Sequence, residues 1–272
     1  MKRHNIKEDP RLWNDHVTVS ASGQASRMRP YLIEQGFPDG TPKSALLTGE
    51  GESLLGRVTK QSMEIGHPIL YANYISAPFF RKAAGMPQDV TLEINVNIEG
   101  PLGPIYHDAL RTHKQSYMIA ADLWAEFSME DFRKFHNSHD KPASIVVGPS
   151  VPAKGGARFN VAKDGTVESW ERVENTTEDD LINIGVYIMD GFDPRMVEVI
   201  DSLVSKTHKE DPFNDAMIEK GLLAAYVLPS LAFNANNKQV YEALKKYTKG
   251  RPTVPEFPSK NPINFITGPD IP

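Results

Sequence analysis

Residues 117–147 read YMIAADLWAEFSMEDFRKFHNSHDKPASIVV and contain two kinds of hydrophobic pattern. Tyr117 to Ala121 is a short continuous apolar run, which is typical of a buried strand. Met129 to His136 has apolar residues at helical spacing, and Ser128 stands where a helix N-cap is expected. Ser144 to Val147 is apolar again and predicts a second strand. A strand, a helix and a further strand in this order indicate alternating α/β architecture.

The alternation continues on both sides of this segment. Further strands are predicted at residues 17–19, 69–75, 90–98 and 182–189, and further helices after Ser53 and at residues 77–84, 105–112, 194–204, 215–220 and 240–247. A hairpin is predicted at residues 159–170, because Asp164-Gly165 supplies the positive φ angles of a tight turn. We therefore expect an α/β fold: a three-layer α/β/α sandwich with a mixed, mainly parallel sheet and a small hairpin insertion.

The domain organisation follows from where this alternation begins and ends in the 272 residues. Residues 1–16 are expected to be an N-terminal extension and residues 17–249 a single domain. Residues 250–272 contain six prolines, which cannot continue a helix or a central strand. We expect this segment to be an extended proline-rich arm, and it is a candidate contact for a homo-oligomer.

Composition excludes several classes of function. The chain has 30 Lys and Arg against 35 Asp and Glu, a formal charge of −5, and no basic run, so nucleic acid is not an expected partner. No cysteine is present, which excludes disulfides, thiolate metal sites and a cysteine nucleophile. No apolar run approaches the roughly 20 residues of a membrane helix and no signal peptide begins the sequence, so we expect no membrane partner and a cytoplasmic location.

The segment VSASGQASRMRP, residues 19–30, is a candidate phosphate-binding loop. Small residues after a strand let backbone N–H groups approach a triphosphate closely. Arg27 would act as a forked donor to phosphate oxygens, and Lys43 further along the chain as a compact point charge. Taken alone, such a segment is more often an ordinary loop.

Asp122 is a candidate metal ligand, since it directly follows the apolar run Tyr117 to Ala121. A carboxylate at the carboxyl end of a strand can hold a hard cation such as Mg²⁺ that bridges phosphates. A turn residue or a helix cap is the other interpretation. His136 and His139 could share a helix face as metal ligands, but a polar helix end is the favoured interpretation.

Six segments, taken in order, resemble the signature of the sugar-phosphate nucleotidyltransferases, the pyrophosphorylases that make nucleotide sugars. They are VSASGQASRMRP (19–30), PKSALL (42–47), GESLL (51–55), EGPLGPIYHDAL (99–110), DGTV (164–167) and INIGVY (182–187). The resemblance covers about residues 17–244. It implies a Rossmann-like glycosyltransferase-A fold and, as substrates, a nucleoside triphosphate and a phosphosugar.

The resemblance also implies roles for individual residues. Arg27 and Lys43 would hold phosphates, and Asp122 would bind Mg²⁺ together with Asn236, or with Asn234 as the other candidate. The nucleotide contacts would be Ser20, Ala21, Ser22, Gly23, Asn97 and Gly103. The sugar-phosphate contacts would be Glu171, Arg172 and Asn183.

The implied reaction is a Mg²⁺-dependent condensation of a nucleoside triphosphate with a sugar 1-phosphate, or a similar small phosphate, which releases pyrophosphate. It needs positioning and charge neutralisation but no covalent nucleophile. Ala25 and Pro104 depart from the family pattern near the expected nucleotide site, so a nucleotide-binding regulatory protein without turnover is the alternative. A glycosyltransferase is less favoured, because Leu123 and Trp124 follow Asp122 where those enzymes carry a second acid.

Overall fold

The structure is a computed structural model. It describes residues 16–21, 28–73, 75–80, 82–87, 90–94, 100, 102–112, 114–204, 206–207 and 209–251. The proposed extension at 1–16 and the arm at 250–272 therefore lie almost wholly outside the described residues, and their boundaries remain predictions. None of the helices in the described part combines the length and the apolar character that a membrane span requires.

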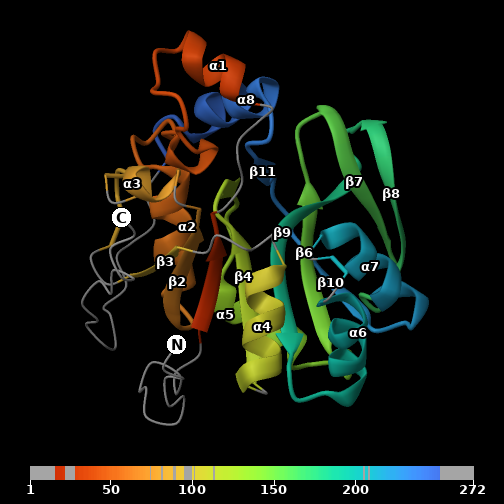
Figure 1. The fold of residues 1–272 in the computed structure, drawn as a ribbon. Coiled ribbons are helices and arrows are strands. Elements are labelled where there is room, and N and C mark those ends of the chain that lie inside the picture. The colour runs from red at the N-terminus through yellow and green to blue at the C-terminus, as the bar shows by residue number, and fades with distance from the viewer. Residues whose placement is uncertain are drawn as a thin grey trace, which may run out of the picture.

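A mixed sheet forms the centre of the molecule (Figure 1). Its strands run in the order β10-β6-β9-β4-β1-β2-β3. Their bounds are β1 (His16–Ser20), β2 (His67–Ala72), β3 (Thr91–Ile94), β4 (Gln115–Ala120), β6 (Ala143–Pro149), β9 (Leu181–Asp190) and β10 (Leu223–Val227). Strand β9 is antiparallel to both β4 and β6, whereas the other adjacent pairs along this order are parallel. This confirms the mixed, mainly parallel sheet.

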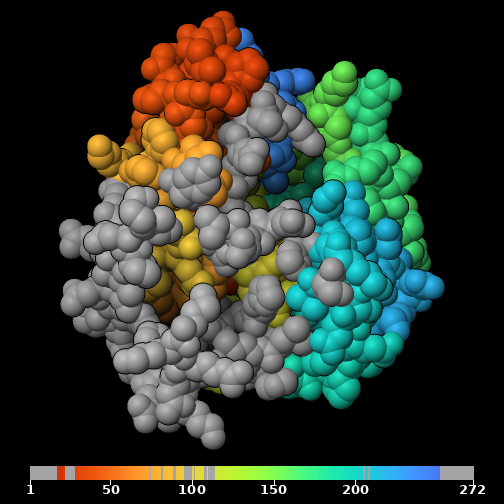
Figure 2. All heavy atoms as spheres, viewed as in Figure 1, coloured from red at the N-terminus to blue at the C-terminus, as the bar shows by residue number. Residues whose placement is uncertain are grey.

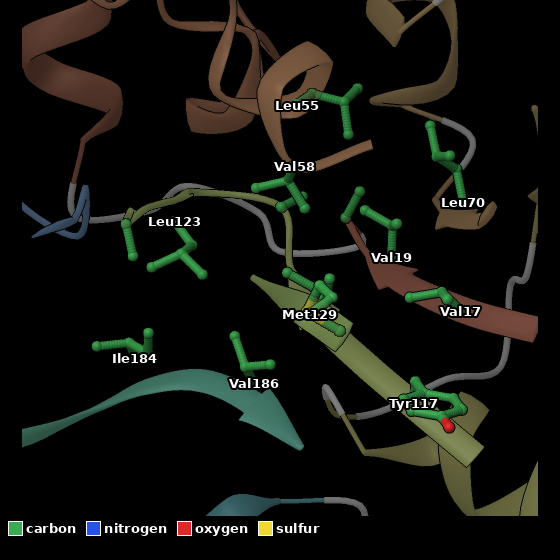
Figure 3. Close-up of a cluster of buried hydrophobic side chains, with 14 of the residues drawn as sticks. Val17, Val19, Leu55, Val58, Leu70, Tyr117, Leu123, Met129, Ile184 and Val186 are labelled. Atoms are coloured by element: carbon green, nitrogen blue, oxygen red, sulfur yellow. The ribbon is translucent and has the colours of Figure 1, made fainter. Parts of the chain in front are cut away.

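Helices cover both faces of the sheet, as the three-layer prediction requires. Helices α2 (Leu54–Ser62), α3 (Ala77–Phe80) and α5 (Met129–His136) share one apolar cluster with the sheet, and α4 (Gly103–Thr112), α6 (Pro194–Val204) and α7 (Glu210–Glu219) share the other. Strand β4 supplies both: Tyr117 and Ile119 belong to the first cluster (Figure 3), and Met118 to the second. The continuous apolar run of β4 is thus explained by burial on both faces.

A third apolar cluster lies beyond the carboxyl ends of the central strands. It combines residues of α1 (Arg29–Glu34), of the two-residue strands β5 (Leu123–Trp124) and β11 (Phe233–Asn234) and of α8 (Lys238–Thr248). It also contains Leu46, which follows the 3₁₀ turn η3 (Lys43–Ala45). Trp124 is buried in it, with ring centroids 5.8 Å from Phe233 and 5.3 Å from Tyr247. This cluster joins chain segments that are more than 200 residues apart.

The hairpin insertion consists of β7 (Lys154–Val161) and β8 (Val167–Asn175), which pair with each other along most of their length. Gly165 lies in the turn with a φ of +85°, as the Asp-Gly pair predicted. The hairpin remains attached to the main sheet through β7, where Arg158 pairs with Ile182 of β9. It rises beside α7 (Figure 1).

Sequence patterns predicted most elements within a few residues, and two helices exactly as observed, α5 and α6. Ser53 and Ser128 cap α2 and α5, since their Oγ atoms accept hydrogen bonds from the backbone N–H groups of Gly56 and Asp131. The start of α7 was predicted wrongly at Asp215. The helix begins five residues earlier, because proline is tolerated in a first helical turn. Helix α1 and strand β10 were not predicted, and residues 95–98 of the strand expected at 90–98 lie outside the described residues.

The two histidines of α5 and its C-terminal turn form a buried cluster at the amino ends of β4 and β6. His136 Nδ1 lies 2.8 Å from Ser144 Oγ, and His136 Nε2 lies 3.0 Å from Asp190 Oδ1. His139 Nε2 lies 3.0 Å from the same Ser144 hydroxyl. His136 is the last residue of α5, at the helix end where the sequence predicted polar residues, and its ring is buried. Desolvation, followed by the neighbouring His136, lowers the pKa of His139.

Candidate active site

The predicted phosphate-binding loop follows β1, which lies between the parallel strands β2 and β4. Ser20 ends β1, and its carbonyl accepts a hydrogen bond of 3.0 Å from the N–H of Ala121. Ala21 donates to the carbonyl of Tyr71 at 2.9 Å. Ser20 and Ala21 therefore lie at the carboxyl edge of the sheet, where ligands of α/β proteins bind. Ser22, Gly23, Arg27 and Asn97, the other residues predicted there, lie outside the described residues.

Asp122 follows β4 at this same edge and is held by a local β-ladder. Its carbonyl accepts a hydrogen bond of 3.0 Å from the N–H of Ala235, and the next residue, Leu123, pairs with Asn234. These backbone bonds bring the segment from Asn234 to Asn236 beside Asp122, although more than 100 residues separate them in the sequence. The predicted metal-binding residues are therefore neighbours in the fold.

Lys43 reaches the same position from a third segment of the chain. It begins the 3₁₀ turn η3, whose backbone bonds run from Ala45 to Pro42 and from Leu46 to Lys43. Its ammonium group forms an ion pair with the Asp122 carboxylate and donates a hydrogen bond to Asn236 Oδ1. The side chains are 21% and 11% exposed for Lys43 and Asp122, so the pair is largely shielded from water.

The oxygen atoms around Asp122 fit the coordination chemistry of Mg²⁺. Asn234 Oδ1 is buried and has no hydrogen-bond partner. An unpaired buried oxygen carries a desolvation penalty that a cation could relieve. Mg²⁺ prefers oxygen ligands and is commonly held by one or two carboxylates together with substrate phosphates and water. No cluster of three His, Asp or Glu residues that could hold a metal exists in the described part of the chain, so Asp122 with an asparagine amide is the available donor set.

Asn183 occupies a bulge of β9 that faces the end of β4. Strand β9 pairs Tyr187 with Ile145 and Asn183 with Val147, so extra residues of β9 bulge between these pairs. Gly185 within the bulge has a φ of +80°, and a Cβ atom there would lie 2.7 Å from the Cβ of Ala120. Asn183 Oδ1 accepts a hydrogen bond of 2.8 Å from the Gly185 N–H, and its Nδ2 donates to the Tyr187 hydroxyl. The INIGVY motif is thereby explained as the sequence of a bulge at the edge of the site.

The hairpin carries Glu171 and Arg172, but the structure gives them different partners. Arg172 forms a forked ion pair with Asp211 of α7, with Nε 3.1 Å from Oδ2 and Nη2 2.5 Å from Oδ1. Glu171 forms an ion pair with Arg158 of β7, which also contacts Asp180. Consecutive residues of a strand point to opposite faces of it. The structure therefore places Arg172 toward α7 and does not bring Glu171 to the same side.

Glu210, the first residue of α7, is a site residue that sequence reasoning missed. Burial is the main cause that raises the pKa of its carboxyl group to about 7. Arg172 and Lys43 act in the opposite direction, and Asp122 and Asp211 raise the pKa further. Glu210 is therefore near enough to both ion pairs for their charges to affect its pKa. A signal in the sequence could have revealed the start of α7: Glu210 and Asp211 directly precede Pro212, and acidic residues are typical of the first turn of a helix.

Gly103 begins α4 at the same edge, because α4 leads from β3 into the parallel strand β4. Its N–H lies 3.4 Å from the carbonyl of Gly100. Pro104 occupies the next position of the helix, where a missing N–H leaves no hydrogen bond unmade. The departure from the family pattern at Pro104 is thus compatible with a regular helix start.

The predicted site residues that the structure describes therefore fall into two groups. Lys43, Asp122 and Asn236 are in direct contact, whereas Arg172 lies on the hairpin and is paired with Asp211 of α7. Figure 2 shows the surface hollowed between the orange α1 region, the green hairpin and the cyan α7, with blue atoms visible inside the hollow. Lys43 and Arg172 are the cationic side chains of these two groups, and each is paired with an aspartate.

The chain is similar in sequence to sugar-phosphate nucleotidyltransferases. It is 26% identical over 219 residues to mannose-1-phosphate guanylyltransferase catalytic subunit beta of Danio rerio. It is 24% identical over 220 residues to the protein of the same name from Xenopus tropicalis. Each match covers 77% of this chain and 58% of the relative, so the chain spans little more than half the length of these relatives. No family model matches the chain.

Solved structures share its fold. A protein from Bacillus anthracis, described as a glucose-1-phosphate thymidylyltransferase in complex with a sucrose, superposes with a TM-score of 0.67 at 11% identity. This match covers 89% of the present chain and 98% of the other. HddC from Yersinia pseudotuberculosis, complexed with GMP-PN, superposes with a TM-score of 0.63 at 17% identity, covering 86% and 100%. The expected resemblance and the expected fold are both confirmed.

Proposed function

We propose that this chain is a Mg²⁺-dependent nucleotidyltransferase that joins a nucleoside triphosphate to a sugar 1-phosphate and releases pyrophosphate. The observation that carries the proposal is the convergence of Lys43, Asp122 and Asn236 at the carboxyl edge of the sheet. Three distant segments supply a cation, a carboxylate and an amide oxygen at one point. The similarity to guanylyltransferases that are named for a sugar 1-phosphate supports the same reaction class.

The reaction brings two negatively charged substrates together, and their charges must be neutralised. A phosphate oxygen of the sugar attacks the α-phosphorus of the triphosphate, a new P–O bond forms, and the bond to the bridging oxygen of the leaving pyrophosphate breaks. Both reactants are anions, so catalysis consists mainly of alignment and neutralisation. Mg²⁺ held by Asp122 and an asparagine amide would supply positive charge to the phosphates. Lys43 binds triphosphate oxygens as a point charge, and Arg172 faces the sugar phosphate.

Guanosine triphosphate and a hexose 1-phosphate are the first substrates to test. Relatives of this chain are named guanylyltransferases that act with mannose 1-phosphate, and one structural neighbour was crystallised with GMP-PN. The residues predicted to contact the base are Asn97 and Gly103. The choice of base and sugar is therefore part of the proposal and the aim of the experiment.

The test is a pyrophosphate-release screen of four nucleoside triphosphates against a panel of sugar 1-phosphates with Mg²⁺. We expect one pair of substrates to give turnover, and we expect Asp122→Ala to lower kcat by at least about 100-fold, because it removes a charge that acts in the transition state. The matched control is Asp131→Ala, which removes an exposed aspartate that is paired with Lys134 on α5. No turnover with any pair, or equal turnover of both variants, would contradict the proposal.

A nucleotide-binding protein without turnover is the second candidate. It is favoured by one observation: the oxygen donors beside Asp122 are asparagine amides and not a second carboxylate. Fewer negative ligands hold a divalent cation more weakly. Calorimetric binding of a Mg²⁺-nucleotide complex without pyrophosphate release in the same screen would establish this candidate over the enzyme.

A further inference from the structure

Lys43 occupies the oxygen atoms that are expected to bind the metal ion. The resemblance assigns Lys43 to the triphosphate, and Asp122 with an asparagine to the metal. In the structure the ammonium group of Lys43 contacts Asp122 and Asn236 directly. A metal ion on Asp122 would stand beside this ammonium group, and like charges so close repel each other, so Lys43 and a metal ion compete for this position.

We propose that Lys43 is a built-in competitor that keeps free divalent cations off Asp122 until a triphosphate draws its ammonium group away. Metal and nucleotide would then enter the site together, and neither would bind well alone. The inference rests on the proposed function for the ligand that displaces Lys43. It concerns the order of binding, which the similarity to known transferases does not address.

The surroundings of Asp122 explain why Lys43 stays in the absence of ligand. A carboxylate that is 11% exposed would be costly without a counter-charge, and Lys43 supplies one. Glu210 adds a further acidic group whose charge interacts with both Asp122 and Lys43. Asn236 Oδ1 accepts a second hydrogen bond from the ammonium and fixes its direction.

The backbone of Lys43 explains why only the side chain needs to move. The turn η3 is closed by hydrogen bonds of 3.0 Å and 3.1 Å, and the neighbouring Ser44 is buried. The lysine stem has four flexible carbons and can reach more than one acceptor from a fixed Cα. A triphosphate offers several anionic oxygens against one carboxylate. When the ammonium leaves, the carboxylate of Asp122 and the amide oxygen of Asn236 become available to the arriving metal.

The experiment is a titration of the nucleotide-free protein with Mn²⁺, in which the electron paramagnetic resonance signal of the unbound ion measures how much Mn²⁺ is bound. We expect Lys43→Gln and Lys43→Met to bind Mn²⁺ at least about tenfold more tightly than the unmodified chain, because a competing charge is removed. The double variant Lys43→Gln, Asp122→Asn should lose this gain. Lys134→Gln, which removes a lysine from an exposed pair with Asp131, is the matched control and should change nothing.

Folding is checked for each variant by its thermal transition, and Lys43→Gln keeps an N–H donor in case Lys43→Met does not fold. Unchanged Mn²⁺ affinity in the folded Lys43 variants would overturn the inference, as would a gain that persists in the double variant. Because no substrate is present, the result is independent of turnover. A tenfold gain together with a failed pyrophosphate screen would reject the proposed transferase and leave the competition established.

Discussion

The two ends of the central sheet both bury charged groups, but they satisfy them differently. At the amino end, Asp190 contacts His136 and accepts a hydrogen bond from Gln115, and Ser144 lies within hydrogen-bonding distance of His136 and His139. At the carboxyl end, Asn234 Oδ1 has no partner, and Lys43 and Asp122 hold each other where substrates would bind.

This difference suggests that the amino end of the sheet serves the stability of the fold and the carboxyl end serves ligand binding. The histidine cluster at the amino end joins α5 to β6 and β9 through contacts among its own members, so it stabilises the fold. The carboxyl end keeps groups whose best partners are absent, as is usual for a binding site. Substitutions at the amino end should therefore change stability alone, and those at the carboxyl end should change ligand binding.

The largest effect on stability is expected from His136→Ala. The substitution leaves Ser144 and Asp190 without their main partner in a buried place, so the free energy of unfolding should fall by about 2–3 kcal/mol. Urea denaturation measures it. His139→Ala removes a less buried ring that contacts the same Ser144 hydroxyl, so it should lower the free energy of unfolding by less. A change in substrate KM for folded His136→Ala would contradict the division between the two ends.

A pH-dependent effect is expected from Glu210→Gln at the carboxyl end. The pKa of Glu210 is raised from 4.5 in its ordinary state to about 7 in the fold. The folded protein therefore binds this proton more tightly than the unfolded chain, and stability declines as pH rises from 4.5 to 7. Glutamine removes that decline, so the variant should be more stable than the original chain by roughly 1–3 kcal/mol at pH 8.

The measurement is the free energy of unfolding at pH 5 and at pH 8. The gain should be much smaller at pH 5, where the carboxyl group of Glu210 is mostly protonated in the fold. Glu219→Gln, the same change at the exposed end of α7, serves as the control and should show no such pH dependence. An equal gain at both pH values would mean that burial of the charge is not the cause.

The smallest effect is expected from Asp211→Asn, which releases Arg172. The pair is exposed, so stability should change by less than about 1 kcal/mol, and the KM for the sugar phosphate should fall only about two- to fivefold. Arg172→Gln should instead raise that KM by about tenfold or more, because a charge-assisted hydrogen bond is lost. Pyrophosphate-release kinetics check both, and a KM that rises in both variants would show that the pair acts as a unit.

Most of the fold could be predicted because its signals are local. The alternating apolar segments, the two serine caps and the Asp-Gly turn each depend on residues within one element. Helix α1 and strand β10 were missed for a different reason. Their helical or extended state is selected by packing in the third cluster and against β6, which no short window of sequence contains.

The site could be predicted only in part for the same reason. Lys43 and Asp122 were singled out by their places after a loop and a strand, and the order of motifs supported them. That Lys43 meets Asp122 and Asn236 depends on the packing of three distant segments, two of which are joined by the ladder between Leu123 and Asn234. The partners of Arg172 and the raised pKa of Glu210 depend on how the hairpin and α7 are placed.

The sequence by itself determined the class of fold and predicted a candidate site at the carboxyl ends of the strands, with residue types that suit phosphate chemistry. These properties follow from periodicity and from the chemistry of single residues. Only the tertiary structure decided which charges meet, which histidines are buried and which oxygens remain without a partner. Charge pairing and desolvation depend on distances between segments far apart in the chain, and folding alone sets those distances.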